Sequence, residues 1–399
     1  MLLNGENPIT YFAQTNFRNE RKLFGIKKRD RRAHMYVIGK TGTGKSTLLE
    51  TLIGQDIKNG EGLALLDPHG DLVEKVLKAI PDERKNDLIY FNVADIKNPL
   101  GFNPLENVPA EKRSLAASGL LDAFKKIWAD SWGPRLEHIL RNALLALLDQ
   151  PEATLADVPR LLEDPGYRRE VCFRVSNSQV RDFWLGEYEN YPARLRAEAI
   201  APIQNKVGAF LTNPLLNSIL TQPRSAFDLR RVMDDGKILL VNLAKGKIGE
   251  DASSLLGALL VTKIGLTALS RADIPEERRR DFYLYMDEFQ NFATLSFANI
   301  LSETRKYRLS LVAANQFLGQ VDPNVLDAIL GNVGTIISFR LGLTDAEILS
   351  QEFYPTFSAK DLISLPNYHI YLRLMIDGVV SQPFSGETLH TADLTTEHE

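Results

Sequence analysis

The sequence GKTGTGKS, residues 39–46, has the residue types and spacing of a loop that holds phosphate groups. It fits the pattern G-x-x-x-x-G-K-[ST], and it lies between a short apolar segment, 35–39, and a helical pattern, 45–56. Its glycines let backbone N–H groups approach phosphate oxygens without an intervening Cβ atom. Lys45 would place a positive charge near the β- and γ-phosphates, and the Ser46 hydroxyl would bind Mg²⁺. The helix would add the positive end of its dipole.

These features predict that the loop binds a nucleoside triphosphate together with Mg²⁺. The alternative is a glycine-rich turn that binds nothing, and the strand and helix patterns on either side make that alternative the weaker one. The residues predicted to contact the nucleotide are Gly39, Lys40, Thr41, Gly42, Thr43, Gly44, Lys45, Ser46 and Thr47.

Two adjacent carboxylates, Asp287 and Glu288, follow the apolar run Phe282–Met286. The run has no charge and no alternation, so it is typical of a strand that is covered on both faces. In a protein with a phosphate-binding loop, a second strand ends in an aspartate that holds Mg²⁺, often through water. Asp287 fits this role, and Glu288 then lies where a base could orient and deprotonate the attacking water. Without the loop, the pair would be equally well explained as exposed acids at the end of a strand.

Gln316 follows another apolar segment, LSLVAAN, residues 309–315. Ligands collect at the carboxyl ends of the strands in a parallel sheet. If this strand lies beside the strand that precedes the phosphate-binding loop, the Gln316 amide would touch the γ-phosphate or the attacking water. The alternative is a polar residue at a strand end that is bonded to a loop.

The elements that must position these residues alternate between strand and helix patterns, which predicts a parallel α/β sheet. The predicted strands are residues 35–39, 62–67, 88–92, 237–243, 282–287, 309–315 and 334–340. The last predicted element, residues 369–385, is a β-hairpin with Asp377-Gly378 at its turn.

Residues 109–231 differ from the rest because no segment among them has a strand pattern. The segments 111–128, 134–150 and 193–211 instead carry apolar residues at helical spacing. We therefore predict an all-α insertion within an α/β domain. The predicted parts are the first part of the α/β domain at 1–108, the insertion at 109–231 and the second part at 232–399.

Composition limits the classes of protein that the chain can belong to. The net charge of −4, from 47 basic and 51 acidic residues, excludes a generally cationic nucleic-acid binder but not a locally basic channel. The one cysteine, Cys172, excludes an internal disulfide and a cysteine-rich zinc site. No apolar run reaches the roughly 18–20 residues that span a membrane. We expect a protein of the cytoplasm, held at the inner face of the membrane, if at all, by partners.

The densest basic stretch, residues 17–34, leaves its function open. It could bind the phosphate backbone of a nucleic acid, bind anionic lipid, or form a solvated connector, which is the commoner role of a charge run. No stretch interleaves aromatic with basic residues in the manner of a platform for stacking single strands. The sequence therefore does not locate a DNA-binding loop.

Taken together, five segments resemble the HerA–FtsK superfamily of ring ATPases. Within it the chain is most similar to the TraG/TraD-like coupling proteins of conjugative type IV secretion, over roughly residues 17–385. The resemblance implies a RecA-like P-loop NTPase motor domain with an inserted all-α domain. The segments are HMYVIGKTGTGKSTLL (34–49), LLDPHGDL (65–72), YLYMDEFQNFA (283–293), ETRKYRLSLVAANQ (303–316) and GNVGTIISFR (331–340).

The resemblance also implies roles for single residues. Asp287 matches the family's metal ligand, Glu288 its catalytic base and Gln316 its sensor glutamine, whereas Arg305 falls where the family places an arginine that reaches a neighbour's nucleotide. Asp67 begins the DPHGD turn, which resembles a family signature but is equally well explained as a plain turn. The residues that match the nucleotide loop are Gly39, Gly44, Lys45 and Ser46.

The function implied by the resemblance is an ATP-hydrolysing, Mg²⁺-dependent DNA translocase, a homo-oligomer expected to be a hexamer, with DNA in its central channel. Secretion-system or relaxosome proteins are the implied partners. Members of the group commonly carry N-terminal membrane helices, and we expect none in this chain. The residues alone leave two alternatives open: an ATPase that powers protein secretion or remodelling, and an assembly module that binds nucleotide without turnover. Glu288 and Gln316 argue against the assembly module, because a site that only binds nucleotide does not need them.

Overall fold

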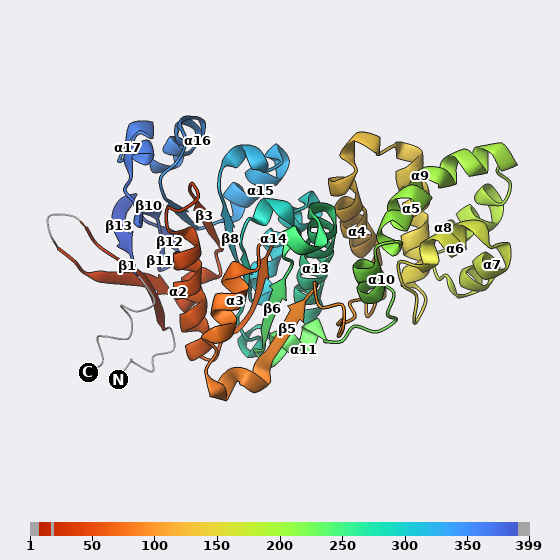
Figure 1. Cartoon of the computed structure of the whole chain (residues 1–399), viewed down its shortest axis with the longest axis horizontal. Coiled ribbons are helices and arrows are strands. Elements are labelled where there is room, and N and C mark those ends of the chain that lie inside the picture. Colours follow the sequence, from red (N-terminus) through yellow and green to blue (C-terminus); the bar gives the residue numbers. More distant parts are fainter. Residues whose placement is uncertain (1–7, 17–19, 390–399) are drawn as a thin grey trace. The chain divides into compact units, whose positions relative to one another are not determined.

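The structure is a computed structural model that describes residues 8–16 and 20–389 of the chain. Its internal contacts divide it into two compact units (Figure 1). The first comprises the described residues of Met1–Tyr90, Arg230–Asn242 and Arg271–Glu399, and the second comprises Phe91–Leu229 and Leu243–Ser270. This division rests on contacts, and the domain limits predicted at residues 108/109 and 231/232 stay predictions.

One sheet of eleven strands carries all the predicted motifs, in the order β2-β1-β13-β10-β9-β3-β8-β7-β4-β6-β5. Neighbours from β9 to β6 pair in parallel, whereas β10, β13, β1 and β2 form antiparallel pairs at one end. The mostly parallel sheet is therefore confirmed. The strands that match predictions are β3 Met35–Ile38, β4 Gly62–Asp67, β5 Leu88–Asn92, β6 Ile238–Asn242, β7 Phe282–Met286, β8 Leu309–Asn315 and β9 Thr335–Ser338.

The parallel strands are apolar throughout because both of their faces are buried. Every residue of β3, β4, β7 and β8 is buried. On one face, Val37, Leu65 and Tyr285 share a core cluster with Leu49 of α2 and Val73 of α3. Burying each such side chain stabilises the fold by about 1.5–3 kcal/mol, so this packing holds both helices on the sheet. It thereby fixes the loops that lead from β3 into α2 and from β4 into α3.

The helices of the first unit connect these strands, and α2 lies beside α3 (Figure 1). The helices that follow β7 and β8 return the chain to the start of the next strand, as parallel pairing requires. Their bounds are α1 Lys28–Arg31, α2 Lys45–Lys58, α3 Asp71–Lys78, α14 Leu295–Thr304, α15 Pro323–Asn332, α16 Leu343–Leu349 and α17 Ala359–Ser364, and α11 Leu229–Asp234 begins at the boundary between the units.

Two strands near the N-terminus, β1 Ile9–Gln14 and β2 Leu23–Lys27, were not predicted. β1 is held by pairing with β13, a partner more than 300 residues away, which local sequence cannot indicate. The predicted C-terminal hairpin is present as β11 Met375–Ile376 and β12 Val379–Val380, with Asp377-Gly378 between them. The longer strands β10 His369–Arg373 and β13 Phe384–Thr388 flank it and pair with each other.

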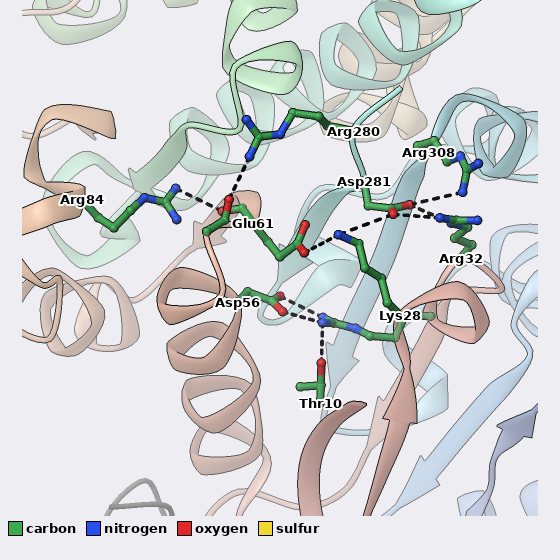
Figure 2. Close-up of polar contacts among 11 residues, drawn as sticks. Thr10, Lys28, Arg32, Asp56, Glu61, Arg84, Arg280, Asp281 and Arg308 are labelled. Atoms are coloured by element: carbon green, nitrogen blue, oxygen red, sulfur yellow. Dashed lines mark hydrogen bonds and ion pairs between the residues drawn. The ribbon is translucent and has the colours of Figure 1, made fainter. Parts of the chain in front are cut away.

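The described part of the basic stretch is used largely in ion pairs within the protein. Arg31 is almost fully buried and forms a two-pronged pair with Asp56 near the end of α2, with 2.9 Å between Nη2 and Oδ2. Figure 2 shows Asp281 beside Arg32, and it shows Lys28 between Glu61 and Asp281. Breaking a buried pair by removing one partner costs about 3–5 kcal/mol. These pairs connect α1 to α2 and to the start of β7. Residues 17–19 of the basic stretch lie outside the described residues.

His34 precedes β3 and is buried in its neutral form. Its Nδ1 accepts a hydrogen bond from the Leu311 N–H at 3.0 Å, and its Nε2 lies 3.1 Å from the Leu301 carbonyl oxygen, so Nε2 carries the proton. Burial, together with the positive charge of Arg305, lowers the pKa of His34 to about 4, although the hydrogen bond to the Leu301 carbonyl acts in the opposite direction. The side chain thus links β8 to α14 only while it is uncharged.

We expect His34 to make the protein lose stability below pH 6.5. Because the folded-state pKa lies below the unfolded value of about 6.5, its contribution is complete above pH 6.5 and falls as the pH approaches 4. The loss by pH 5 is about 2 kcal/mol. His34→Asn removes the titrating group, and asparagine tolerates the backbone φ of 61°. Urea unfolding of both proteins at pH 7 and pH 5 checks this: equal losses in the two proteins would contradict the prediction.

The described residues of the second unit form helices and loops and no strand, apart from the last residues of β5, which confirms the all-α insertion. The predicted helices at 111–128, 134–150 and 193–211 correspond to α4, α5 and α9. The unit also includes α13, which packs against α4. Its helices are α4 Arg113–Ile127, α5 Pro134–Leu148, α6 Asp157–Glu163, α7 Pro165–Arg174, α8 Ser178–Asp182, α9 Ala193–Leu211, α10 Pro214–Leu220, α12 Lys245–Ile248 and α13 Glu250–Ser270.

Within the described part of the chain, one helical stretch, Glu250–Asp273, is long and apolar enough to cross a membrane. However, 94% of its most apolar window is buried within the protein. The core helix of a globular domain has the same length and composition, so this stretch is weak support for a membrane span.

Candidate active site

A cavity of about 340 Å³ lies at the carboxyl ends of β3, β4, β7 and β8. Most of the residues predicted to form the site line it, although they come from four separate parts of the sequence. Gly39, Lys40 and Thr43 of the predicted loop do not line it. The lining residues are Thr41, Gly42, Gly44, Lys45, Ser46, Thr47, Asp67, His69, Asp71, Leu72, Lys75, Asp287, Glu288, Gln316 and Tyr368.

The loop between β3 and α2 has the shape that its glycines predict. Gly42 and Gly44 have φ values of 77° and 122°, which residues with a side chain rarely adopt. A Cβ atom on Gly44 would also lie 2.9 Å from the ring of Tyr368. Within the loop, the Thr43 hydroxyl donates a hydrogen bond to the Lys40 carbonyl at 2.7 Å and so stabilises the turn. The loop ends at the N-terminus of α2, where free backbone N–H groups suit an anion.

Lys45, the first residue of α2, is 6% exposed and points back into the loop. Its ammonium group donates hydrogen bonds to the carbonyl oxygens of Gly39 and Lys40. Burial lowers its pKa, and the carboxylates of Glu288 and Asp287 act in the opposite direction. The cavity thus contains a buried ammonium group that faces two carboxyl groups.

We expect Lys45→Ala to lower the affinity for MgATP by at least about a hundredfold, because hydrogen bonds to charged groups contribute about 1.5–3 kcal/mol each. Titration with a fluorescent ATP analogue measures the change. Lys40→Ala is the matched control: Lys40 is exposed on the same loop, and its removal should change the affinity less than about fivefold. Tight binding by the Lys45→Ala protein would remove this loop from the phosphate site.

Asp287 fits a magnesium ligand because its carboxylate is buried among other acids. It is 7% exposed, and burial together with Asp67 and Glu288 raises its pKa to about 7. A cation would relieve this repulsion, and the Ser46 hydroxyl lines the same cavity. The described residues hold no group of three or more His, Cys, Asp or Glu placed to bind a metal by themselves. Phosphate and water oxygens would therefore complete the shell of Mg²⁺, as they commonly do for this ion.

Glu288 is held in one orientation by two amides. Its Oε1 accepts a hydrogen bond from Gln316 Nε2 at 2.8 Å, and its Oε2 accepts one from Gln290 Nε2 at 2.7 Å. Its backbone lies in the left-handed region, with φ of 49°, a strained conformation that collects at active sites. β3 and β8 pair directly, with Ile38 beside Asn315, so the condition set for Gln316 is met. Gln316 lines the same cavity as the phosphate-binding loop, and its amide contacts Glu288.

Asp67 has a structural role that explains the DPHGD turn. Its carboxylate accepts hydrogen bonds from the backbone N–H groups of His69, Leu72 and Val73, at 2.8, 2.9 and 3.1 Å. It thereby caps the first turn of α3, where four N–H groups lack helical partners. Gly70 has φ of 90° and is packed against Asn242, where no side chain would fit. The turn holds α3 at the wall of the cavity.

Arg305 is not brought to this cavity. It is exposed, and it follows α14 where the chain turns back into β8. β8 begins beside the start of β7, since Leu309 pairs with Phe282, whereas Asp287 follows the opposite end of β7. Arg305 therefore lies at the far edge of the sheet from its own nucleotide site, and its action on a neighbour stays a prediction.

Comparison with known families identifies the chain. The sequence profile of the type IV secretion-system coupling protein DNA-binding domain matches residues 22–347. The chain belongs to this coupling-protein family. No curated protein matches it in sequence.

Solved structures of a coupling protein and of VirB4 share the fold. The conjugative coupling protein TrwB, as TrwBdeltaN70 in an unbound monoclinic form, is similar with a TM-score of 0.64 and 19% identity, over 97% of this chain and 95% of that one. TrwB with the non-hydrolysable ATP analogue ADPNP gives 0.63 and 19%, over 97% and 96%. VirB4 of Thermoanaerobacter pseudethanolicus gives 0.64 and 14%, over 97% of each chain. At these identities the likeness establishes the RecA-like fold of the coupling-protein family.

The motifs of this coupling protein do not include all residues at the cavity. Tyr368, His69 of the DPHGD turn and the α3 residues Asp71, Leu72 and Lys75 also line it, and none was predicted to contact the nucleotide. The position of α3 at the cavity could be predicted from the DPHGD turn once β4 is known to lie beside β7. No sequence pattern predicts that Tyr368 lines the cavity, because its position there depends on the antiparallel pairing of β10 with β9.

Proposed function

We propose that this chain hydrolyses ATP and uses the free energy to move DNA, acting as a ring of identical subunits, expected to be a hexamer. The observation that carries the proposal is the meeting of Lys45, Asp287, Glu288 and Gln316 in one cavity. A site that only binds nucleotide has no need for a buried carboxylate oriented by an amide from the next strand. The DNA part is supported by membership of the coupling-protein DNA-binding family.

The residues divide the reaction among them. Lys45 and the backbone of the loop bind the phosphates, and the relatives solved with ADPNP and with ADP and Mg²⁺ support this assignment. Ser46 and Asp287 would hold Mg²⁺, which neutralises phosphate charge when bound. Glu288 accepts the proton of the attacking water, and Gln316 keeps that carboxylate in place. We further propose that the protein works in the cytoplasm at the inner face of the membrane, with secretion-system or relaxosome proteins.

The rate of ATP hydrolysis with and without DNA tests the proposal. We expect Mg²⁺-dependent turnover that single- or double-stranded DNA stimulates. Turnover that neither form of DNA changes would indicate a motor for protein secretion or remodelling instead. Tight ATP binding without turnover, in the presence of DNA and Mg²⁺, would indicate an assembly module.

A further inference from the structure

Tyr368 lines the cavity from the side opposite to the catalytic residues. In the sheet, β9 and β10 lie on one side of β3, whereas β8 and β7 lie on the other. Ser338 of β9 pairs with Ile38 at the end of β3 and with Tyr371 near the start of β10. The start of β10 is therefore at the same edge as the phosphate-binding loop, and Tyr368 directly precedes it. The loop separates Tyr368 from Glu288.

The backbone of Tyr368 is fixed to that loop. Its N–H donates to the Thr43 carbonyl at 2.8 Å, and its own carbonyl accepts from the Thr388 N–H at 2.8 Å. Its φ of 67° is unfavourable for tyrosine, and these bonds on both sides maintain it. The ring lies against the loop, since its Cδ1 is 2.9 Å from the point where a Cβ on Gly44 would be. The half-buried ring still lines the cavity, so part of its surface faces the space beside the loop.

The direction of a bound nucleotide follows from the catalytic residues. Water activated by Glu288 must reach the γ-phosphorus, so the γ-phosphate lies on the side of β7 and β8. The α-phosphate and the nucleoside then extend across the loop towards the side of β9 and β10. Tyr368 is the one Phe, Tyr or Trp among the cavity's described lining residues. His69 is not an alternative, because it follows β4, which lies beyond β7 on the catalytic side.

We propose that Tyr368 stacks on the base of the bound nucleotide and so contributes affinity for the nucleoside rather than for the phosphates. This inference rests on the proposed function, since it requires a nucleotide in the cavity. The stacked face would be the ring and not the hydroxyl, because bases and aromatic rings attract through their π-faces.

The test compares two probes, MgATP and magnesium tripolyphosphate, by isothermal titration calorimetry on the full chain. Tyr368→Asn removes the ring, and asparagine tolerates the left-handed backbone better than alanine does. Tyr368→Phe keeps the ring and is the matched control. We expect Tyr368→Asn to weaken ATP binding about tenfold and to leave tripolyphosphate binding unchanged, with Tyr368→Phe close to the wild type for both probes.

Equal weakening of both probes in Tyr368→Asn would show that the ring only shapes the loop, and no weakening of either would show that it touches no ligand. Weakening by Tyr368→Phe as large as that by Tyr368→Asn would assign the effect to the hydroxyl. Each of these results overturns the inference and leaves the proposed function standing. If neither probe binds the wild-type protein, the proposed function itself fails.

Discussion

Glu288→Gln is expected to lower kcat for ATP hydrolysis by about 10²–10⁴-fold while the affinity for MgATP changes less than about threefold. The amide has the shape of the carboxylate, and its oxygen can still accept the hydrogen bond from Gln316. It cannot take a proton from water. Because Lys45 and the loop bind the ground-state phosphates, binding does not depend on the base. Single-turnover hydrolysis, together with an equilibrium titration of the same samples, separates the two effects.

Gln290→Ala is the matched control for this variant. It removes the second amide that contacts Glu288, at 2.7 Å, without removing the base. We expect a smaller loss of kcat than with Glu288→Gln, since Gln316 still orients the carboxylate. Near wild-type hydrolysis by the Glu288→Gln protein would rule out Glu288 as the base.

Arg305→Ala is expected to lower the hydrolysis rate by about 10³–10⁵-fold, the range in which arginines that stabilise phosphoryl transfer act. Arg305 is exposed at the edge of the sheet opposite to its own cavity, so it cannot serve that cavity. In the proposed ring, such an edge can face the phosphates of the next subunit. Arginine suits the task because its charge is permanent and its fork matches phosphate oxygens. Lys306→Ala, which removes the exposed neighbouring charge, should leave the rate unchanged.

Mixing two inactive proteins tests whether Arg305 acts between subunits. Glu288→Gln and Arg305→Ala should each bind ATP and fail to hydrolyse it. In mixed rings, some interfaces join an intact Glu288 site to an intact Arg305, so hydrolysis should partly return. A mixture that stays inactive, while mixed rings are shown to form by native mass spectrometry, would contradict the assignment.

Local sequence was sufficient to predict those parts of the fold and site that depend on patterns among neighbouring residues. The uninterrupted apolar runs of β3, β4, β7 and β8 identify strands buried on both faces. The position of Gln316 was predictable because carboxyl ends of neighbouring parallel strands meet at one edge. In the second unit, α4, α5 and α9 were predictable from their periodic apolar residues.

What the sequence did not indicate depends on long-range pairing. β1 is a strand because β13, at the other end of the chain, pairs with it. In the sequence, Arg31 and Asp56 cannot be distinguished from charged residues on the surface, yet in the fold they are buried and form an ion pair with each other. Tyr368 reaches the active site through the register of β10 on β9 and through a backbone conformation that no local pattern predicts.

The central claim is that hydrolysis at this site moves the protein along DNA, and displacement of a bound obstacle measures it most directly. Two substrates are used: a linear duplex that carries a bound third strand, and a single DNA strand with streptavidin attached at its end. Each is incubated with the protein and MgATP. We predict ATP-dependent displacement from at least one substrate by the wild-type protein and none by Glu288→Gln, which still binds ATP and DNA. Wild-type protein that hydrolyses ATP on both substrates and displaces neither obstacle would contradict the account.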